Sequence, residues 1–205
     1  MKSNIKFAFD LDGTVTKQEM LTILARELGL EEEMKILTDL TLKGIISFEH
    51  SFRLRVSILK AIPISKIHKI VERVDLDQNI IEFIIENREI CSIITGNLDI
   101  WVLPIMEKLK CKLYSSKGIF HSDRLIGLEE ILIKNRAIRD FKKNKDRVVT
   151  IGESINDIPM FTEGHIGIAY GGVHEPVKEI LDICDYVVYK SQDLCDLLNR
   201  LKLHE

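Results

Sequence analysis

Two carboxylates near the start of the chain, Asp10 and Asp12, have a type and spacing that could act together on one ligand. They follow the apolar residues 7–9, and such a run closed by Asp-x-Asp-Gly predicts a buried parallel strand whose carboxyl end opens into a polar site. Side chains two positions apart on a strand point the same way, and Gly13 allows a sharp turn. Two crowded acids repel each other unless a cation or a phosphoryl group lies between them. We therefore expect chemistry at the end of this strand.

Three later segments also place polar residues just after apolar runs, where an open α/β sheet binds its ligands. Thr95-Gly96-Asn97 offers a hydroxyl and backbone amides to phosphate oxygens, although such turns are common and structural. Lys134 follows the apolar residues 131–133, and a surface helix lysine is the usual explanation for a single lysine. Glu153 and Asp157 lie just past residues 148–151, which predict a buried strand, and two acids at that place are a more specific signal.

Between the first strand and residue 75 the sequence predicts helices and no strand. The expected helices cover residues 16–29, 31–43, 48–60 and 67–74, with turns at Gly44 and Pro63. A helical insertion of this length predicts a small four-helix-bundle cap, residues 16–75, over the carboxyl end of the sheet. Thr16 and Glu19 have the spacing of a capping box, so one interpretation of Glu19 is a helix cap.

After Asp77 the pattern changes to an alternation of helices and strands. We expect helices at 80–87, 99–109, 129–143, 155–163, 173–181 and 191–203, strands at 90–95, 111–114, 147–151, 166–169 and 186–189, and a hairpin at 118–127. This alternation predicts an α/β fold in which residues 1–15 and 76–205 form a doubly wound, Rossmann-like parallel sheet with helices on both faces.

The four strand-end motifs, taken in order, resemble those of the haloacid dehalogenase superfamily of phosphatases and phosphotransferases. Residues 18–20, 44–49 and 53–57 are also similar to cap segments of the phosphoserine phosphatases, and the similarity runs almost end to end. The resemblance implies a Mg2+-dependent hydrolase that dephosphorylates O-phosphoserine through an aspartyl-phosphate, a step of serine biosynthesis. Three positions depart from the family pattern: Glu153 where Asp is usual, Thr95-Gly96-Asn97 where Ser-Gly-Gly is usual, and the Gly13-Thr14 ending of the first motif.

The resemblance also implies a role for each matching residue. Asp10 would be the nucleophile and Asp12 the general acid and base. The implied Mg2+ ligands are Asp10, Asp12, Glu153 and Asp157, and the implied substrate-binding residues are Glu19, Phe48, Arg55, Thr95, Gly96, Asn97, Lys134 and Asn156. An arginine fork and a nearby acid suit the carboxylate and ammonium groups of a zwitterion, although a solvated helix face would also explain Arg55.

Composition narrows the class of partner. The net charge is −3 and no basic cluster occurs, so we expect a small-molecule phosphomonoester as partner and no nucleic acid. No apolar stretch is long enough to cross a bilayer, so we expect no membrane association. The scattered cysteines Cys91, Cys111, Cys184 and Cys195 suggest reduced thiols and a cytoplasmic location. The histidines fall at no metal-ligand spacing, which favours surface or packing roles, and a homodimer is compatible with the sequence.

Three other functions stay open at this stage. The phosphoryl group could pass to an alcohol such as homoserine, which would make the protein a phosphotransferase, or the substrate could be another small phosphomonoester. From a different class, a receiver-like phospho-acceptor domain also combines an aspartate with Thr and Lys on a doubly wound sheet. A receiver needs neither a helical insertion nor a second acid such as Asp12, and both features argue against it.

Overall fold

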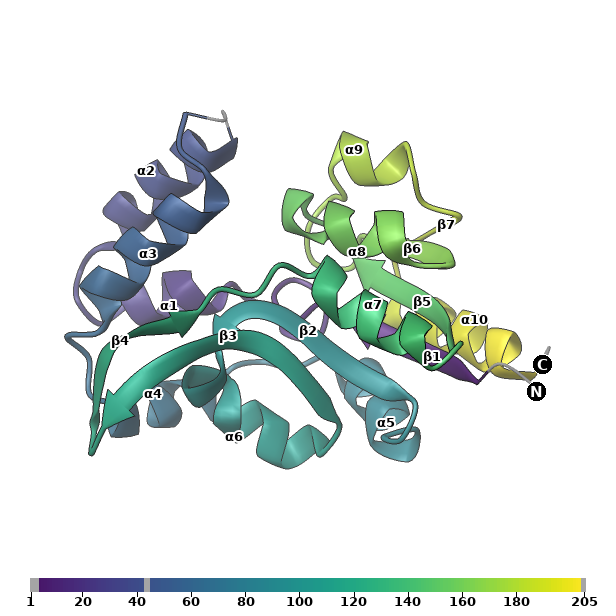
Figure 1. Ribbon diagram of the computed structural model, residues 1–205, viewed down its shortest axis with the longest axis horizontal. Coiled ribbons are helices and arrows are strands. Elements are labelled where there is room, and N and C mark those ends of the chain that lie inside the picture. Colours follow the sequence, from purple (N-terminus) through teal and green to yellow (C-terminus); the bar gives the residue numbers. More distant parts are fainter. Residues whose placement is uncertain (1–3, 43–44, 204–205) are drawn as a thin grey trace.

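Helices cover both faces of one seven-stranded sheet in the computed structural model, which describes residues 4–42 and 45–203 (Figure 1). The strand order is β4-β3-β2-β1-β5-β6-β7, and only β4 runs antiparallel to its neighbour. The strands are β1 (Ile5–Phe9), β2 (Cys91–Leu98), β3 (Lys112–His121), β4 (Arg124–Glu130), β5 (Arg147–Gly152), β6 (Ile166–Tyr170) and β7 (Tyr186–Val188). The predicted α/β fold with a mostly parallel sheet is therefore confirmed, and the expected turn at Gly44 lies outside the described residues.

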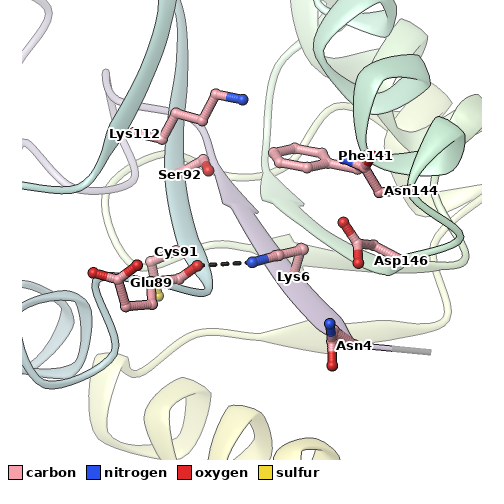
Figure 2. Close-up of a pocket in the computed structure, with 9 residues that line it drawn as sticks. All are labelled: Asn4, Lys6, Glu89, Cys91, Ser92, Lys112, Phe141, Asn144 and Asp146. Carbon is pink, nitrogen blue, oxygen red and sulfur yellow. Dashed lines mark hydrogen bonds between the residues drawn. The ribbon is translucent and has the colours of Figure 1, made fainter. Parts of the chain in front are cut away.

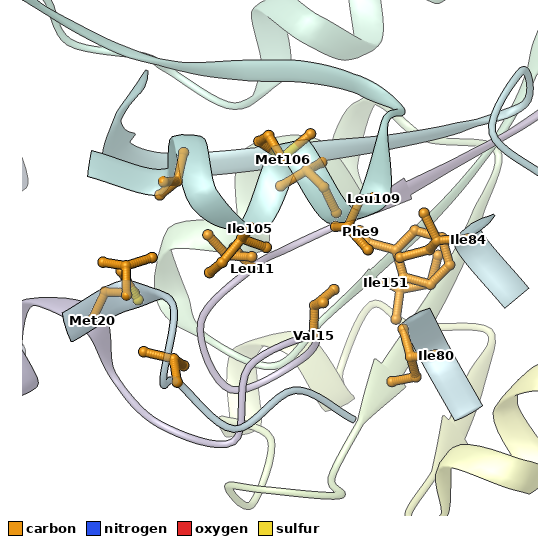
Figure 3. Close-up of a cluster of buried hydrophobic side chains, with 14 of the residues drawn as sticks. Phe9, Leu11, Val15, Met20, Ile80, Ile84, Ile105, Met106, Leu109 and Ile151 are labelled. Atoms are coloured by element: carbon orange, nitrogen blue, oxygen red, sulfur yellow. The ribbon is translucent and has the colours of Figure 1, made fainter. Parts of the chain in front are cut away.

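Alternation along β1 divides the core into two layers. Phe7 and Phe9 face the larger hydrophobic cluster, to which α5, α6 and α10 contribute, while Ala8 faces a smaller cluster under α7, α8 and α9. Figure 3 shows the larger cluster, in which β1 and the segment after it meet the side chains of α5 and α6. These helices are α5 (Gln78–Glu86), α6 (Asp99–Leu109), α7 (Asn135–Lys143), α8 (Ile158–Glu163), α9 (Lys178–Leu181) and α10 (Ser191–Leu203).

In the described part of residues 16–75, four helices follow β1 at the carboxyl edge of the sheet, which is the number that the sequence predicts. They are α1 (Met20–Arg26), α2 (Glu31–Leu42), α3 (Phe48–Leu59) and α4 (Ile64–Val71). The first three pack on one another, whereas α4 packs mainly on α6. His68 of α4 hydrogen bonds the Ile100 carbonyl (2.7 Å), and Asp123, in the turn between β3 and β4, accepts hydrogen bonds from the Ser65 amide (2.6 Å) and hydroxyl (2.7 Å). The β3–β4 hairpin therefore fastens α4 to the sheet.

Three local predictions are wrong, each for a tertiary reason. The expected helix 129–143 begins only at Asn135, because Glu130 continues β4 by pairing with Lys117 across the hairpin. The expected helix 173–181 covers only α9, which starts after Pro176. The Thr16–Glu19 capping box does not form, since the Thr16 hydroxyl donates to the Leu11 and Gln18 carbonyls.

Smaller differences concern element ends. The predicted strand 111–114 and the first strand of the predicted hairpin form one continuous strand, β3. It pairs in parallel with β2 and then antiparallel with β4. Helix α4 starts three residues earlier than expected, at Ile64. Among residues 4–42 and 45–203, no helix combines the length and the apolar character that a bilayer crossing requires.

Replacing Phe83 by Ala tests the larger cluster. Its ring lies 5.5 Å from that of Phe7 and 6.3 Å from that of Phe9 (centroid distances), and the residue is 4% exposed. Emptying this position should destabilise the protein by about 3 to 5 kcal/mol, measured by urea unfolding. Ile85→Ala on the same helix, where the side chain is 37% exposed, is the matched control and should cost less than about 1 kcal/mol. Equal losses would show that the cluster does not depend on this ring.

Candidate active site

A buried lysine joins two of the predicted site acids. Lys134 Nζ, just before α7, lies 2.5 Å from Oδ1 of Asp10 and 2.6 Å from Oδ1 of Asp157. The three side chains are at most 7% exposed. The Leu11 amide also donates to Oδ1 of Asp10 (2.7 Å), and no described residue forms a hydrogen bond to Oδ2. The geometry therefore fixes one Asp10 oxygen and leaves the other available for chemistry.

Asp12 is held by neutral donors. The Met20 amide, at the start of α1, donates to Oδ1 (2.9 Å), and the Asn97 side-chain amide donates to Oδ2 (2.5 Å). Thr95 Oγ1 accepts from both the main-chain (3.1 Å) and the side-chain (3.2 Å) nitrogen of Asn97, so its own proton can be donated to a ligand. Asn97, one of the departures from the family pattern, thus lies against the predicted general acid.

Glu153 brings a third carboxylate beside Asp10 and Asp157. Oxygen atoms of these three side chains lie within 4.8 Å of one another. Thr14 Oγ1 donates to Glu153 Oε2 (3.1 Å), so two departures from the family pattern contact each other. Gly13 has a φ of +71°, and a Cβ atom there would lie 2.7 Å from Glu153 Oε1. Glycine is required at this turn both by its backbone conformation and by the approach of Glu153.

Asp157 serves the site as an orienting group. Its Oδ2 accepts hydrogen bonds from the amides of Glu153 (3.0 Å) and Ser154 (2.9 Å) and from the Ser154 hydroxyl (3.1 Å), while Oδ1 faces Lys134. The side chain is fully buried in the short helix η1 (Ile155–Asp157), directly after β5. These contacts occupy both oxygens and hold the lysine toward Asp10.

Burial and mutual repulsion raise the pKa of three of these acids. Burial and then Asp157 raise the pKa of Asp10 to about 8, and burial and then Glu19 raise that of Asp12 to about 7. The pKa of Glu153 rises to about 10, first from burial and then from Asp10. Burial alone would lower the pKa of Lys134, but the two acids beside it raise it instead. One lysine does not balance these carboxylates, and their hard oxygen donors suit Mg2+.

The helical insertion contributes a second group of predicted residues. Arg55 Nη2 donates to Thr38 Oγ1 (2.8 Å), and its Nε is buried without a partner among the described residues. Burial lowers the pKa of Arg55 and the neighbouring Glu19 opposes this shift. Phe48 lies against the sheet, since a Cβ atom on Gly96 would be 3.1 Å from its ring. Phe48 therefore lies over β2 at Gly96, and Arg55 lies near Glu19.

Asn156, a predicted substrate-binding residue, directly precedes Asp157 in η1. It is exposed on η1, and its side chain makes no hydrogen bond with another described residue. The sequence interpretation in turn missed Thr14, Ser154 and His174. Ser154 has a detectable signal, because Ser154-x-x-Asp157 has the spacing of a capping box and forms one. His174 has no such sequence signal. It lies in the loop after β6, and only the folded structure brings it near Glu19 (3.6 Å between Nε2 and Oε1).

Comparisons with known proteins show to which family the chain is similar. A family model for haloacid dehalogenase-like hydrolases matches residues 7–162. A protein named phosphoserine phosphatase from Methanocaldococcus jannaschii is 32% identical over 95% of this chain and 96% of its own length.

The chain belongs to the haloacid dehalogenase-like hydrolase family. A second phosphoserine phosphatase, from Archaeoglobus fulgidus, is 25% identical over 95% of this chain, which spans 59% of that longer protein. Among solved structures, a substrate-bound phosphoserine phosphatase complex superposes with a TM-score of 0.80 at 29% identity, covering 98% of this chain and 99% of that one. Membership of this hydrolase family favours an enzyme over a receiver-like domain.

The raised pKa values predict that the metal-free protein loses stability as the pH rises. Unfolded Asp and Glu ionise near 3.8 and 4.5, whereas folded Asp10 and Glu153 hold their protons to about 8 and about 10. The folded state therefore binds more protons between these limits, and its stability falls from about pH 5 to pH 9. Mg2+ should raise the unfolding temperature more at pH 9 than at pH 5, because it binds the ionised acids.

The control is Glu153→Gln, which removes one of the two acids whose raised pKa causes this pH dependence. Its unfolding temperature, followed by calorimetry in EDTA, should depend less steeply on pH than that of the wild type. A wild-type unfolding temperature that rises from pH 5 to pH 9 in EDTA would contradict the pKa assignments.

Proposed function

We propose that this chain is a Mg2+-dependent phosphatase that hydrolyses O-phosphoserine to serine and phosphate through an aspartyl-phosphate on Asp10. The observation that carries the proposal is the unequal environment of Asp10 and Asp12. Asp10 lies beside Lys134 and keeps one carboxylate oxygen without a hydrogen-bond partner among the described residues. Asp12 accepts hydrogen bonds from two amides, and the pKa of Asp12 is about 7. The two acids are thereby suited to different steps.

Asp10 is the proposed nucleophile. Lys134 and the Leu11 amide hold Oδ1, so Oδ2 can attack phosphorus in line while the carboxylate keeps its orientation. The new bond joins Oδ2 to phosphorus and the bond between phosphorus and the serine oxygen breaks. Water then attacks the aspartyl-phosphate, which releases phosphate and restores Asp10.

Asp12 is the proposed general acid and base. A group with a pKa of about 7 can give a proton to the departing serine oxygen and then accept one from the attacking water. The Asn97 amide keeps the Asp12 carboxylate in place during both steps. This assigns Asn97 a positioning role in addition to the substrate contact expected from the sequence.

The proposed metal ligands are Asp10, the carbonyl of Asp12 and Glu153, with Asp157 orienting its neighbours. When bound, Mg2+ supplies positive charge that stabilises the phosphoryl oxygens. Lys134 adds a second positive charge beside Asp10, and the Thr95 hydroxyl and the Gly96 amide are the proposed phosphate donors.

Recognition of the serine part is assigned to the helical insertion, the proposed cap of residues 16–75. Arg55 has a buried Nε without a described partner, which a substrate carboxylate can satisfy, and Glu19 can accept a hydrogen bond from the ammonium group. Phe48 covers the phosphate end at Gly96. The four cysteines are free thiols, which supports the proposed cytoplasmic location.

The substrate assignment is tested with Arg55→Ala. Loss of the guanidinium should lower kcat/KM for O-phosphoserine, because the substrate carboxylate then lies unpaired. The loss should correspond to about 2 to 4 kcal/mol of transition-state stabilisation. Hydrolysis of p-nitrophenyl phosphate, which lacks a carboxylate, should change little. The matched control is Arg53→Ala, since Arg53 is 54% exposed and pairs with Glu49 on the same helix. Equal losses on both substrates would assign Arg55 a structural role.

The metal assignment is tested with Glu153→Gln. This change removes a charge but keeps an oxygen for the Thr14 hydroxyl, so the Mg2+ concentration for half-maximal activity should rise about tenfold or more. The KM for O-phosphoserine should rise far less. Glu163→Gln, remote from the strand ends, serves as the control. An unchanged Mg2+ requirement in Glu153→Gln would show that Glu153 does not bind the metal.

A further inference from the structure

A cavity of about 300 Å³ lies at the amino-terminal edge of the sheet, opposite the strand ends that form the site described above (Figure 2). Its walls come from β1, β2, β3 and the end of α7, and no residue proposed for catalysis lines it. Ser92 pairs with Lys112 in the β2–β3 register and with Ala8 in the β1–β2 register. Lys6, two residues before Ala8, therefore shares this face of the sheet.

The cavity lies beside the carboxyl end of α7. Phe141 in its last turn still packs on the smaller hydrophobic cluster with Ala8 and Ile94, but the helix ends at Lys143. The sheet face beyond that point carries the polar side chains Lys6, Ser92 and Lys112 instead of apolar ones. A stretch of sheet is thus left open to a ligand.

The sheet side of the cavity carries two lysines, and the exposed acid Glu89 lies beside them. Lys6 Nζ donates to the Glu89 carbonyl (2.8 Å), which leaves it two further protons. Lys112 Nζ lies 4.6 Å from the ring centre of Tyr114 and 5.7 Å from that of Phe141, without an ion pair to any described residue. Ser92 is 2% exposed, and its hydroxyl has no hydrogen bond to another described residue.

The opposite wall is negatively charged. Asp146 is 7% exposed, lines the cavity, and forms no side-chain hydrogen bond or ion pair within the part of the chain that the structure describes. It follows the carboxyl end of α7, whose helix dipole adds negative character. Its carboxylate oxygens have no competing partner among the described residues, so this wall favours a ligand that brings a donor.

We propose that this cavity binds a small zwitterion of the α-amino-acid type, with its carboxylate toward Lys6, Ser92 and Lys112 and its ammonium group toward Asp146. A simple anion would meet the buried Asp146 carboxylate, and a simple cation would meet two lysines. A ligand carrying both charges satisfies both walls, which face each other without forming an ion pair. The proposal does not depend on the proposed function, because the two sites lie at opposite edges of the sheet.

The test is a titration of the 15N-labelled full chain with glycine, followed by 1H–15N NMR. The amides of Lys6, Ser92 and Asp146 should shift saturably, whereas acetate and glycinamide, which each carry one of the two charges, should bind at least about tenfold more weakly. Asp146→Asn and Lys112→Ala should each weaken glycine binding by about tenfold. Lys143→Ala, at the end of α7 but outside the cavity, should leave the affinity for glycine unchanged.

Each contrary result has a defined meaning. Shifts confined to Leu11 and Asn97 would locate glycine binding in the active site and overturn the proposal. Acetate binding as tightly as glycine, and more tightly in Asp146→Asn, would replace the zwitterion site by an anion site. The absence of saturable shifts at the cavity would remove it as a ligand site. The spectra themselves report whether each variant is folded.

Discussion

The ion pairs of Lys134 with Asp10 and Asp157 are the interaction on which the site depends. Both acids are buried, and Lys134 is the one cation that pairs with them among the described residues. Removing one partner from a buried charge cluster costs about 3 to 5 kcal/mol, because the remaining charges lose their compensation. The same lysine holds one oxygen of Asp10 and leaves the other to react. Stability and reactivity therefore constrain the same three side chains.

The parallel sheet brings these three side chains together at one of its edges. Asp10 follows β1, Asp157 follows β5, and Lys134 directly precedes α7, so three separate connections must converge at one edge. The parallel pairing of β1 with β5 brings the first two together, and α7 packs on the smaller hydrophobic cluster with Ala8 and Val148, which fixes the lysine. Thr95 and Asn97 join from β2 on the other side of β1. The central position of β1 is thus what makes the site possible.

The parts of the fold and site that the sequence predicts are those with local signals. The Asp10–Asp12 spacing, the apolar run before it and the alternation after Asp77 depend on residues near one another in the chain. Lys134 lies among residues expected to be helical, but it directly precedes α7 because Glu130 pairs with Lys117 and continues β4. The contact of His174 with Glu19 joins the loop after β6 to the start of α1, and no sequence pattern near His174 predicts this contact. Long-range contacts of this kind need the folded structure.

The central claim, that Asp10 carries the phosphoryl group, is tested most directly by trapping it. Enzyme turning over O-phosphoserine with Mg2+ is quenched in acid, reduced with borohydride and digested, since reduction converts an aspartyl-phosphate into homoserine. Peptide mass spectrometry should find homoserine at position 10 in the wild type and none in Asp10→Asn. Homoserine at Asp12 or Asp157, or its absence from a wild-type enzyme quenched during rapid turnover, would contradict the account.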